Sequence, residues 1–217
     1  PKAPKSNSFE VLTASEVVNT HGRLGLNSID VKTPQGLRQI QVSALGVSGG
    51  WNPNIHLTCH QRGRPQWDTA LSSFIPSADL PKGLHVAGAA NGQMTTVATI
   101  DDAVKKAAKI TKNCGRKPTP LTKLKTSEES TSITPFWYVT GTERGWVDQQ
   151  NDVTVKDIKL AHQENFRSVE HLKRYTTLGM ATDQGKTSNV LGLAIMAHTA
   201  GQTIPDTGTT IYRPPYS

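Results

Sequence analysis

The sequence contains very little cysteine, with only Cys59 and Cys114 among its 217 residues. Two thiols are too few for the disulfide framework of a small secreted protein, and they fit a reducing compartment. No run of 18 apolar residues occurs and no signal peptide opens the chain, so the sequence predicts a soluble, cytoplasmic protein without a membrane span. A chain of this length can form one large domain or two small ones.

Acidic residues are missing from one long segment. Between Ala103 and Thr126 there are eight Lys or Arg residues and no Asp or Glu, so this segment carries most of the net charge of +7. It also lacks aromatic residues, which nucleic-acid-binding surfaces interleave with basic ones. We therefore expect no nucleic-acid binding and interpret the segment as a solvated helix face that continues into a basic linker. The alternative is a docking surface for an acidic partner subunit.

Recognisable catalytic patterns are missing as well. No Ser-His-Asp or paired-carboxylate arrangement occurs at a readable spacing, so we predict no catalytic residue. His56, Cys59 and His60 fall within five residues, but no second group of ligands has zinc-like spacing, and no metal site is expected. His162 and His171 lie on predicted helices and are interpreted as surface or hydrogen-bonded histidines.

The N-terminal half has the alternation of apolar and polar residues that is typical of strands. A strand is expected within Phe9–Val18, and Leu24–Thr33 and Leu37–Val42 flank a Pro-Gln-Gly turn that predicts a hairpin. Two apolar segments, residues 44–49 and 83–87, are expected strands that run into glycine-rich turns. A helix is expected over Gln93–Lys112, where apolar residues recur at helical spacing.

The turn from Gly88 to Gly92 therefore stands between an expected strand and an expected helix. In such an arrangement a helix N-terminus can receive a phosphate or pyrophosphate. The turn reads GAANG and is not the GxGxxG fingerprint of dinucleotide-binding domains. The alternative is that its glycines serve only the packing of strand against helix.

The C-terminal half predicts three helices. Thr154 is an expected N-cap, with Asp157 completing a capping box and Ile158 and Ala161 on one face. A second helix is expected from Ser168 to Gly179, with an apolar stripe of Val169, Leu172 and Tyr175. A third is expected from Thr187 or Ser188 to Gly201. Residues 113–133 have no periodicity and are interpreted as a linker, and Thr134–Val139 is expected to form an aromatic strand.

The stretch from Asn151 to Ala200 resembles the helical module of the bacterioferritin-associated ferredoxin type, which holds a [2Fe–2S] cluster on two cysteine pairs. The resemblance rests on Val153-Thr154 and Gly179-Met180, which match the anchors beside the two pairs. It implies that the four ligand positions are Asp148, Gln150, Asp183 and Ser188. None of them carries sulfur, and a cluster needs thiolates. We therefore expect a module without a [2Fe–2S] cluster, whose loops are held by hydrogen bonds.

The motif LKRYTTLGMATDQGKTSN, with VDQQNDVT before it and GTTIYRPPY after it, closely resembles the α subunit of heterotetrameric sarcosine oxidase. The resemblance implies an α/β partial dinucleotide-binding domain of the FAD/NAD type, followed by the cluster-less helical module. The expected boundaries are residues 1–112 for the C-terminal part of the NAD-binding domain, 113–133 for the linker, 134–201 for the helical module and 202–217 for a linker toward a folate-binding domain outside this chain. Both ends are expected to be cut from a longer protein.

The resemblance also implies cofactors and partners. It makes Gly88, Ala89, Gly92, Met94 and Thr96 the candidate residues of a partial NAD site. FAD and FMN are expected on a partner subunit or at an interface, and the partners are expected to be a flavin-bearing β subunit and smaller γ and δ subunits. The implied activity is oxidative demethylation of sarcosine to glycine, with the one-carbon unit passing to tetrahydrofolate. The alternatives are a subunit of a related amine or opine dehydrogenase and a non-catalytic interaction module.

Overall fold

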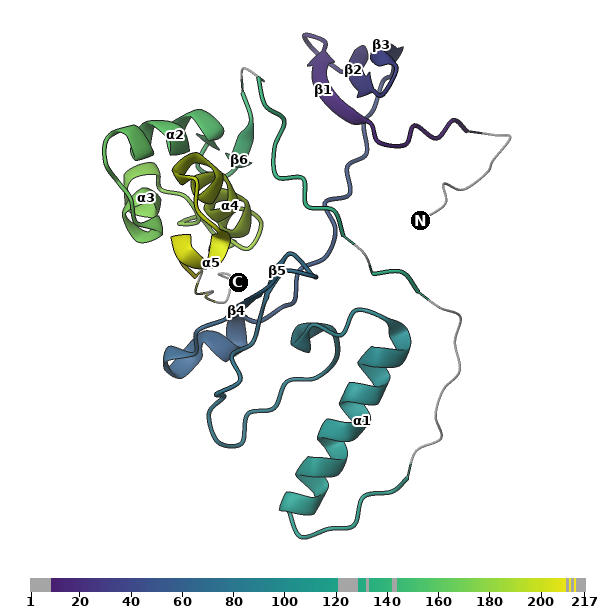
Figure 1. The fold of residues 1–217 in the computed structure, drawn as a ribbon, viewed down its shortest axis with the longest axis vertical. Helices are drawn as coiled ribbons and strands as arrows, with labels where there is room; N and C mark the ends of the chain where they lie inside the picture. The colour runs from purple at the N-terminus through teal and green to yellow at the C-terminus, as the bar shows by residue number, and fades with distance from the viewer. Residues whose placement is uncertain are drawn as a thin grey trace. The chain divides into compact units, whose positions relative to one another are not determined.

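The computed structural model describes residues 9–120, 129–131, 133–141, 144–209, 211 and 213 (Figure 1). The chain divides into two compact units. The first contains residues 1–50 and 138–145, and the second contains residues 51–137 and 146–217. The domain boundaries expected from the sequence stay a prediction.

The first unit is built on a three-stranded antiparallel sheet in the order β1-β2-β3. Its strands are β1 (Glu16–His21), β2 (Ser28–Thr33) and β3 (Gly36–Gln41). The β2–β3 hairpin is confirmed, with Thr33 opposite Gly36 across the turn. Ile29 and Val31 on β2 are buried.

The expected strand at Phe9–Val18 begins only at Glu16 and continues to His21. Residues 13 and 14 form a turn, and Ala14 has a positive φ of 50° that no strand accommodates.

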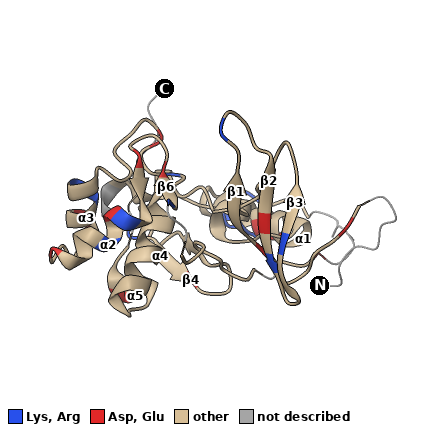
Figure 2. Ribbon diagram, turned by 90° about the horizontal axis from the view of Figure 1, so that it is seen from above, with Lys and Arg blue, Asp and Glu red and all other residues tan. Residues whose placement is uncertain are grey.

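Residues of both charge signs lie on the three-stranded sheet and on helix α2 of the other unit (Figure 2).

The second unit begins with short elements. They are the 3-10 helix η1 (His56–Arg62), strands β4 (Gln66–Asp68) and β5 (Ser73–Ile75), the 3-10 helix η2 (Gly88–Asn91) and helix α1 (Thr96–Asn113). β4 and β5 form an antiparallel pair in which Trp67 and Phe74 pack edge to face at 5.0 Å between ring centroids. Helix α1 confirms the helix expected over Gln93–Lys112.

Three expected strands are absent from the structure. Residues 44–49, 83–87 and 134–139 are all described and none is in a strand. A strand needs a neighbour to bond its N–H and C=O groups, and apolar sequence alone does not provide one. The sheets in the described residues are accordingly small and antiparallel, so the α/β prediction holds only as a mixture of helices and strands.

The helical module follows in the second unit. A two-stranded ribbon of β6 (Trp146–Asp148) and β7 (Val153–Thr154) leads into helices α2 (Val155–Gln163), α3 (Val169–Thr176), α4 (Asn189–Ala200) and α5 (Ile204–Thr207). Helix α4 lies at the centre of this module, and its Leu193, Ile195 and Met196 are almost completely buried. Helix α4 packs against α2, whose Ile158 is fully buried, and α2 also packs against α3, whose Leu172 is buried.

The predicted helix ends are largely confirmed. The Thr154–Asp157 capping box is present, α4 has Ser188 as its N-cap, and Gly201 ends it in the left-handed conformation. Helix α3 ends earlier than expected, at Thr176, and Tyr175 is 42% exposed, so only Val169 and Leu172 of its stripe are buried. The expected linker 202–217 contains helix α5, and the linker 113–133 lies partly outside the described residues. Within the part of the chain that the structure describes, no helix is long and apolar enough to cross a membrane.

Candidate functional site

The most connected polar group of the helical module is the carboxylate of Asp148, which is only 3% exposed. Its Oδ1 accepts hydrogen bonds from the backbone N–H groups of Gln150 (2.9 Å) and Asn151 (3.2 Å). Its Oδ2 accepts one from the N–H of Gly179 (2.8 Å) and a longer one from the Ser188 hydroxyl (3.4 Å). One buried side chain therefore joins the β6–β7 turn, the turn after α3 and the start of α4.

The second feature of this region is the buried side chain of Asn189, which lies between two glycines. A Cβ atom at Gly179 would come within 2.2 Å of Asn189 Oδ1, and one at Gly185 would come within 2.2 Å of Asn189 Nδ2. Both glycines also have positive φ, 69° and 76°. Glycine is required at both positions because any side chain would overlap the amide and strain the backbone. This packing accounts for the spacing of the glycines and asparagine in GMATDQGKTSN.

The four positions expected to have lost cysteine ligands lie around these loops. Asp148 and Ser188 contact each other, and Gln150 accepts a hydrogen bond from the hydroxyl of Thr182, the neighbour of Asp183 (3.1 Å). Asp183 accepts hydrogen bonds from Gly185 N–H (3.1 Å) and from the N–H and hydroxyl of Thr187 (3.2 and 2.7 Å). In this structure these side chains hold loops together. Their descent from a cluster site stays a prediction.

The pKa of Asp183 reflects this loop. Partial burial alone would raise it, but the hydrogen bonds from Thr187 and Gly185 favour the ionised form and hold the pKa below its usual value. Among the described residues, no group of three or more His, Cys, Asp or Glu side chains is arranged to hold a metal ion. His56 and His60 do not form such a group with Cys59, which is buried in η1.

The candidate NAD residues lie in one short segment, from η2 to the first turn of α1. Ala89 and Thr96 are exposed and Met94 is half-buried, so all three can be reached by a ligand. Gly88 and Gly92 are in the left-handed conformation, with φ of 68° and 79°. The space on their Cβ side is filled by Thr99 for Gly88 and by Ile75 and Leu71 for Gly92. A side chain at either glycine would meet residues of the same unit, which fits a packing role, and their part in an NAD site stays a prediction.

The donors of this segment already have partners within the chain. The N–H of Gly88 and the side-chain amide of Asn91 donate to Asp102 (3.0 and 3.1 Å). The N–H and hydroxyl of Thr96 both donate to the carboxylate of Glu129, at 2.6 Å each. Glu129 thus occupies the place at the N-terminus of α1 where an anionic ligand would lie. Thr96 would be free to bind a ligand only after Glu129 had moved away, and the NAD site stays a prediction.

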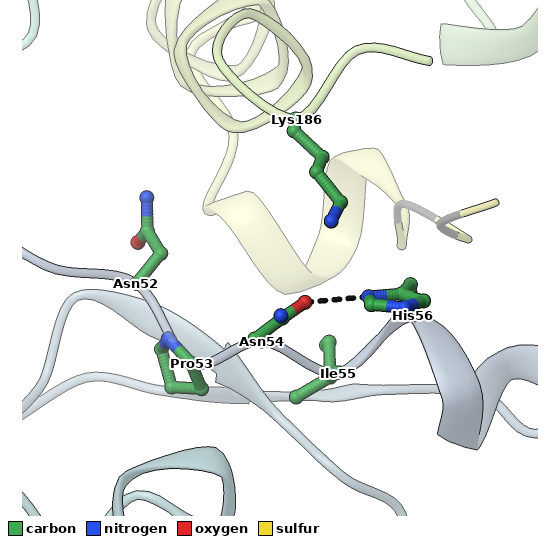
Figure 3. A pocket seen from close by; sticks show the side chains of 6 residues that line it. All are labelled: Asn52, Pro53, Asn54, Ile55, His56 and Lys186. Atoms are coloured by element: carbon green, nitrogen blue, oxygen red, sulfur yellow. Dashed lines mark hydrogen bonds between the residues drawn. The ribbon is translucent and has the colours of Figure 1, made fainter. Parts of the chain in front are cut away.

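A pocket that the sequence did not indicate is lined by six residues of the second unit: Asn52, Pro53, Asn54, Ile55, His56 and Lys186 (Figure 3). Its volume is about 240 Å³. Lys186 is separated from the other five by more than 120 residues, and no local pattern links them. Sequence reasoning considered His56 only as a possible metal ligand.

Comparison with known proteins identifies the C-terminal part of the chain. Residues 142–217 match the sarcosine oxidase A3 domain. The chain is 38% identical over 204 residues to the sarcosine oxidase subunit alpha of Rhizobium meliloti strain 1021, covering 93% of this chain and 21% of that protein. It is 32% identical over 229 residues to the same subunit of Corynebacterium sp. strain U-96, covering 98% of this chain and 24% of that protein.

A third relative is the sarcosine oxidase subunit alpha of Corynebacterium sp. strain P-1, which is 32% identical over 189 residues (83% of this chain and 19% of that protein). The chain therefore spans about a fifth of the length of these relatives. Among solved structures, it superposes on L-proline dehydrogenase from P. horikoshii with a TM-score of 0.68 at 18% identity. That match covers 92% of this chain and 42% of the dehydrogenase, and it shows a shared fold.

Proposed function

We propose that this chain, which is homologous to a segment of the sarcosine oxidase α subunit, acts as a scaffold within a multisubunit oxidoreductase. The observation that supports this most strongly is the identity of 32–38% to three such subunits, which extends over most of the chain. The structure adds a buried polar network around Asp148 and no recognisable catalytic constellation in the described residues.

In the proposed complex, sarcosine is demethylated oxidatively to glycine, and the one-carbon unit passes to tetrahydrofolate. Flavins, FAD and FMN, are held on a partner subunit or at an interface and supply the redox chemistry. This chain contributes the fold that positions its partners, which are a flavin-bearing β subunit and smaller γ and δ subunits of a cytoplasmic heterotetramer. Such partners fit a chain whose own described residues present loops and surfaces and not a reaction centre.

One edge of an NAD site is the second proposed contribution. Ala89, Met94 and Thr96 are accessible and lie in one short segment, and they would hold part of the dinucleotide beside the first turn of α1. Gly88 and Gly92 would support this edge through their backbone conformation. The remaining groups of an NAD site would come from outside this segment.

Co-expression tests the assignment. The full-length subunit that contains this chain is purified together with the flavin-bearing partners. Formation of hydrogen peroxide and reduction of an added artificial electron acceptor are both measured, with sarcosine, with L-proline and with an opine as substrates. We expect a stable complex that forms peroxide only with sarcosine. Activity with L-proline or the opine would favour the related dehydrogenase. A stable complex without any of these activities would favour a non-catalytic interaction module.

A further inference from the structure

The pocket beside Lys186 combines one cation with amide groups and has no acidic residue in its lining. None of its six lining residues is Asp or Glu. In the part of the chain that the structure describes, Lys186 forms no ion pair. Figure 3 shows its ammonium group reaching toward the Asn54–His56 pair from the opposite wall. An unpaired cation in a half-buried position attracts an anion.

The amide groups are oriented so that their donors are available. The oxygen of Asn52 accepts a hydrogen bond from the Ser73 hydroxyl (2.9 Å), which leaves its NH₂ group for the pocket. The oxygen of Asn54 is bonded to Nδ1 of His56 (2.5 Å), so the Asn54 NH₂ group is the part of this amide without a hydrogen-bond partner among the described residues. Both oxygens are engaged by neighbours, so the pocket presents donors.

The His56 ring is suited to fix Asn54. Burial, the charge of Lys186 and that of His60 lower the pKa of His56, in that order. The ring is therefore neutral at pH 7, and its Nδ1–H donates to Asn54. This bond fixes the Asn54 amide at the wall of the pocket and engages its oxygen.

The size and the walls restrict the ligand. A volume of about 240 Å³ is below the range of about 300–1,000 Å³ of pockets for drug-sized ligands, so a whole dinucleotide does not fit. Ile55, one of the two apolar lining residues with Pro53, is 2% exposed. A less polar wall strengthens the attraction between Lys186 and an anion.

We propose that this pocket binds a single phosphoryl group through Lys186, Asn52 and Asn54. An ammonium and two amides from separate points of the wall match the several oxygens of a tetrahedral anion, whereas a planar carboxylate needs fewer donors. The phosphoryl group is either free phosphate or the terminal group of a small phosphomonoester. The inference goes beyond the scaffold role and does not depend on it.

Titration calorimetry of the purified 217-residue chain tests the proposal, with inorganic phosphate, ribose 5-phosphate and acetate as probes. We expect saturable binding of at least one phosphoryl probe and at least tenfold weaker binding of acetate. Lys186→Gln should weaken phosphoryl binding by about tenfold or more, because a charge-assisted hydrogen bond is lost. Lys156→Gln, an exposed lysine on α2, is the matched control and should bind as the wild type does.

Asn54→Asp provides an independent variant, because it replaces the NH₂ donor with a negative oxygen at constant size. It should abolish phosphoryl binding while leaving the circular dichroism spectrum unchanged. Absence of saturable binding in the wild type, equal affinity for acetate, or unchanged affinity in a folded Lys186→Gln or Asn54→Asp chain would each overturn the proposal. A preference for ribose 5-phosphate over phosphate identifies a phosphomonoester as the ligand, and the reverse identifies free phosphate. The titration contains no partner subunit and no sarcosine, so a failure to bind phosphate can be distinguished from a failure of the proposed function.

Discussion

At the scale of single residues, the loops of the helical module are held together by the oxygen atoms of aspartate side chains. Asp148 joins three loop segments through four hydrogen bonds, and Asp183 closes its own loop through three. Aspartate suits this role because its ionised carboxylate accepts several N–H donors at once. Iron and acid-labile sulfide analysis of the purified chain should therefore find neither in stoichiometric amount.

The loop of Asp183 should depend on pH. Its folded-state pKa lies below the unfolded value, so its contribution to stability is present above about pH 4 and is lost as the pH falls through the folded pKa. Asp183→Asn should cost about 1 kcal/mol at pH 7, because a partly exposed charged acceptor is lost. Urea midpoints of the two proteins should differ at pH 7, and the difference should shrink as the pH falls through the lowered pKa of Asp183. A constant difference across this range would exclude the titration of Asp183 as its cause.

Glu129 should compete with NAD for Thr96. Its carboxylate accepts both Thr96 donors, and these hydrogen bonds lower the pKa of Glu129, so it is ionised at neutral pH. Glu129→Ala should increase the affinity of the chain for NAD by about twofold to fivefold, since a negative charge at a helix N-terminus is removed. Titration with NAD measures this, and Asp79→Ala, at another exposed acid, is the control. Equal affinities of Glu129→Ala and wild type would remove Thr96 from the proposed NAD edge.

At the scale of elements, the ends of the helices were well predicted where side chains bond the local backbone. Thr154 and Asp157 form the expected reciprocal cap, with Thr154 N–H to Asp157 at 2.7 Å. Ser168 occupies the expected N-cap position of α3, but its side chain makes no capping hydrogen bond. The residue type alone does not reveal that the side chain of Thr154 makes a capping hydrogen bond and that of Ser168 does not.

These two caps give a matched pair of variants. Thr154→Ala should destabilise the module by about 1 kcal/mol, because the N-terminus of α2 loses its capping hydrogen bonds. Ser168→Ala should change stability by less than about 0.5 kcal/mol, since no capping bond is lost. Urea denaturation followed by circular dichroism measures both. Equal effects of the two substitutions would contradict the capping geometry.

Elements that depend on distant partners could not be predicted. Residues 44–49 and 83–87 have the composition of strands, yet neither is paired with a neighbour in the structure. The same limit applies to the pocket at Lys186, whose other walls come from residues 52–56. By contrast, Gly179 was expected to end a helix, and only the structure shows that the side chain of Asn189 excludes any other residue there.

At the scale of the whole molecule, the chain consists of two compact units, and the helical module lies within the second. The family was recognised from the contiguous motif LKRYTTLGMATDQGKTSN, because Gly179, Gly185 and Asn189, which pack together, all lie within it. The fold of residues 1–112 was predicted less well, since the pairing of strands between distant segments is not specified by any local pattern. The central claim is that the buried carboxylate of Asp148 holds the loops of the helical module together.

Hydrogen exchange measured by mass spectrometry on wild type and Asp148→Ala tests this claim most directly. Ser188→Ala, which loses only the 3.4 Å contact, and the peptide covering β2 and β3 in the first unit serve as controls. In Asp148→Ala we expect exchange at residues 148–151 and 177–189 to accelerate by about tenfold or more, since three N–H groups lose their acceptor. The β2–β3 peptide should be unaffected. Unchanged exchange at residues 148–151 and 177–189 in Asp148→Ala would contradict the account.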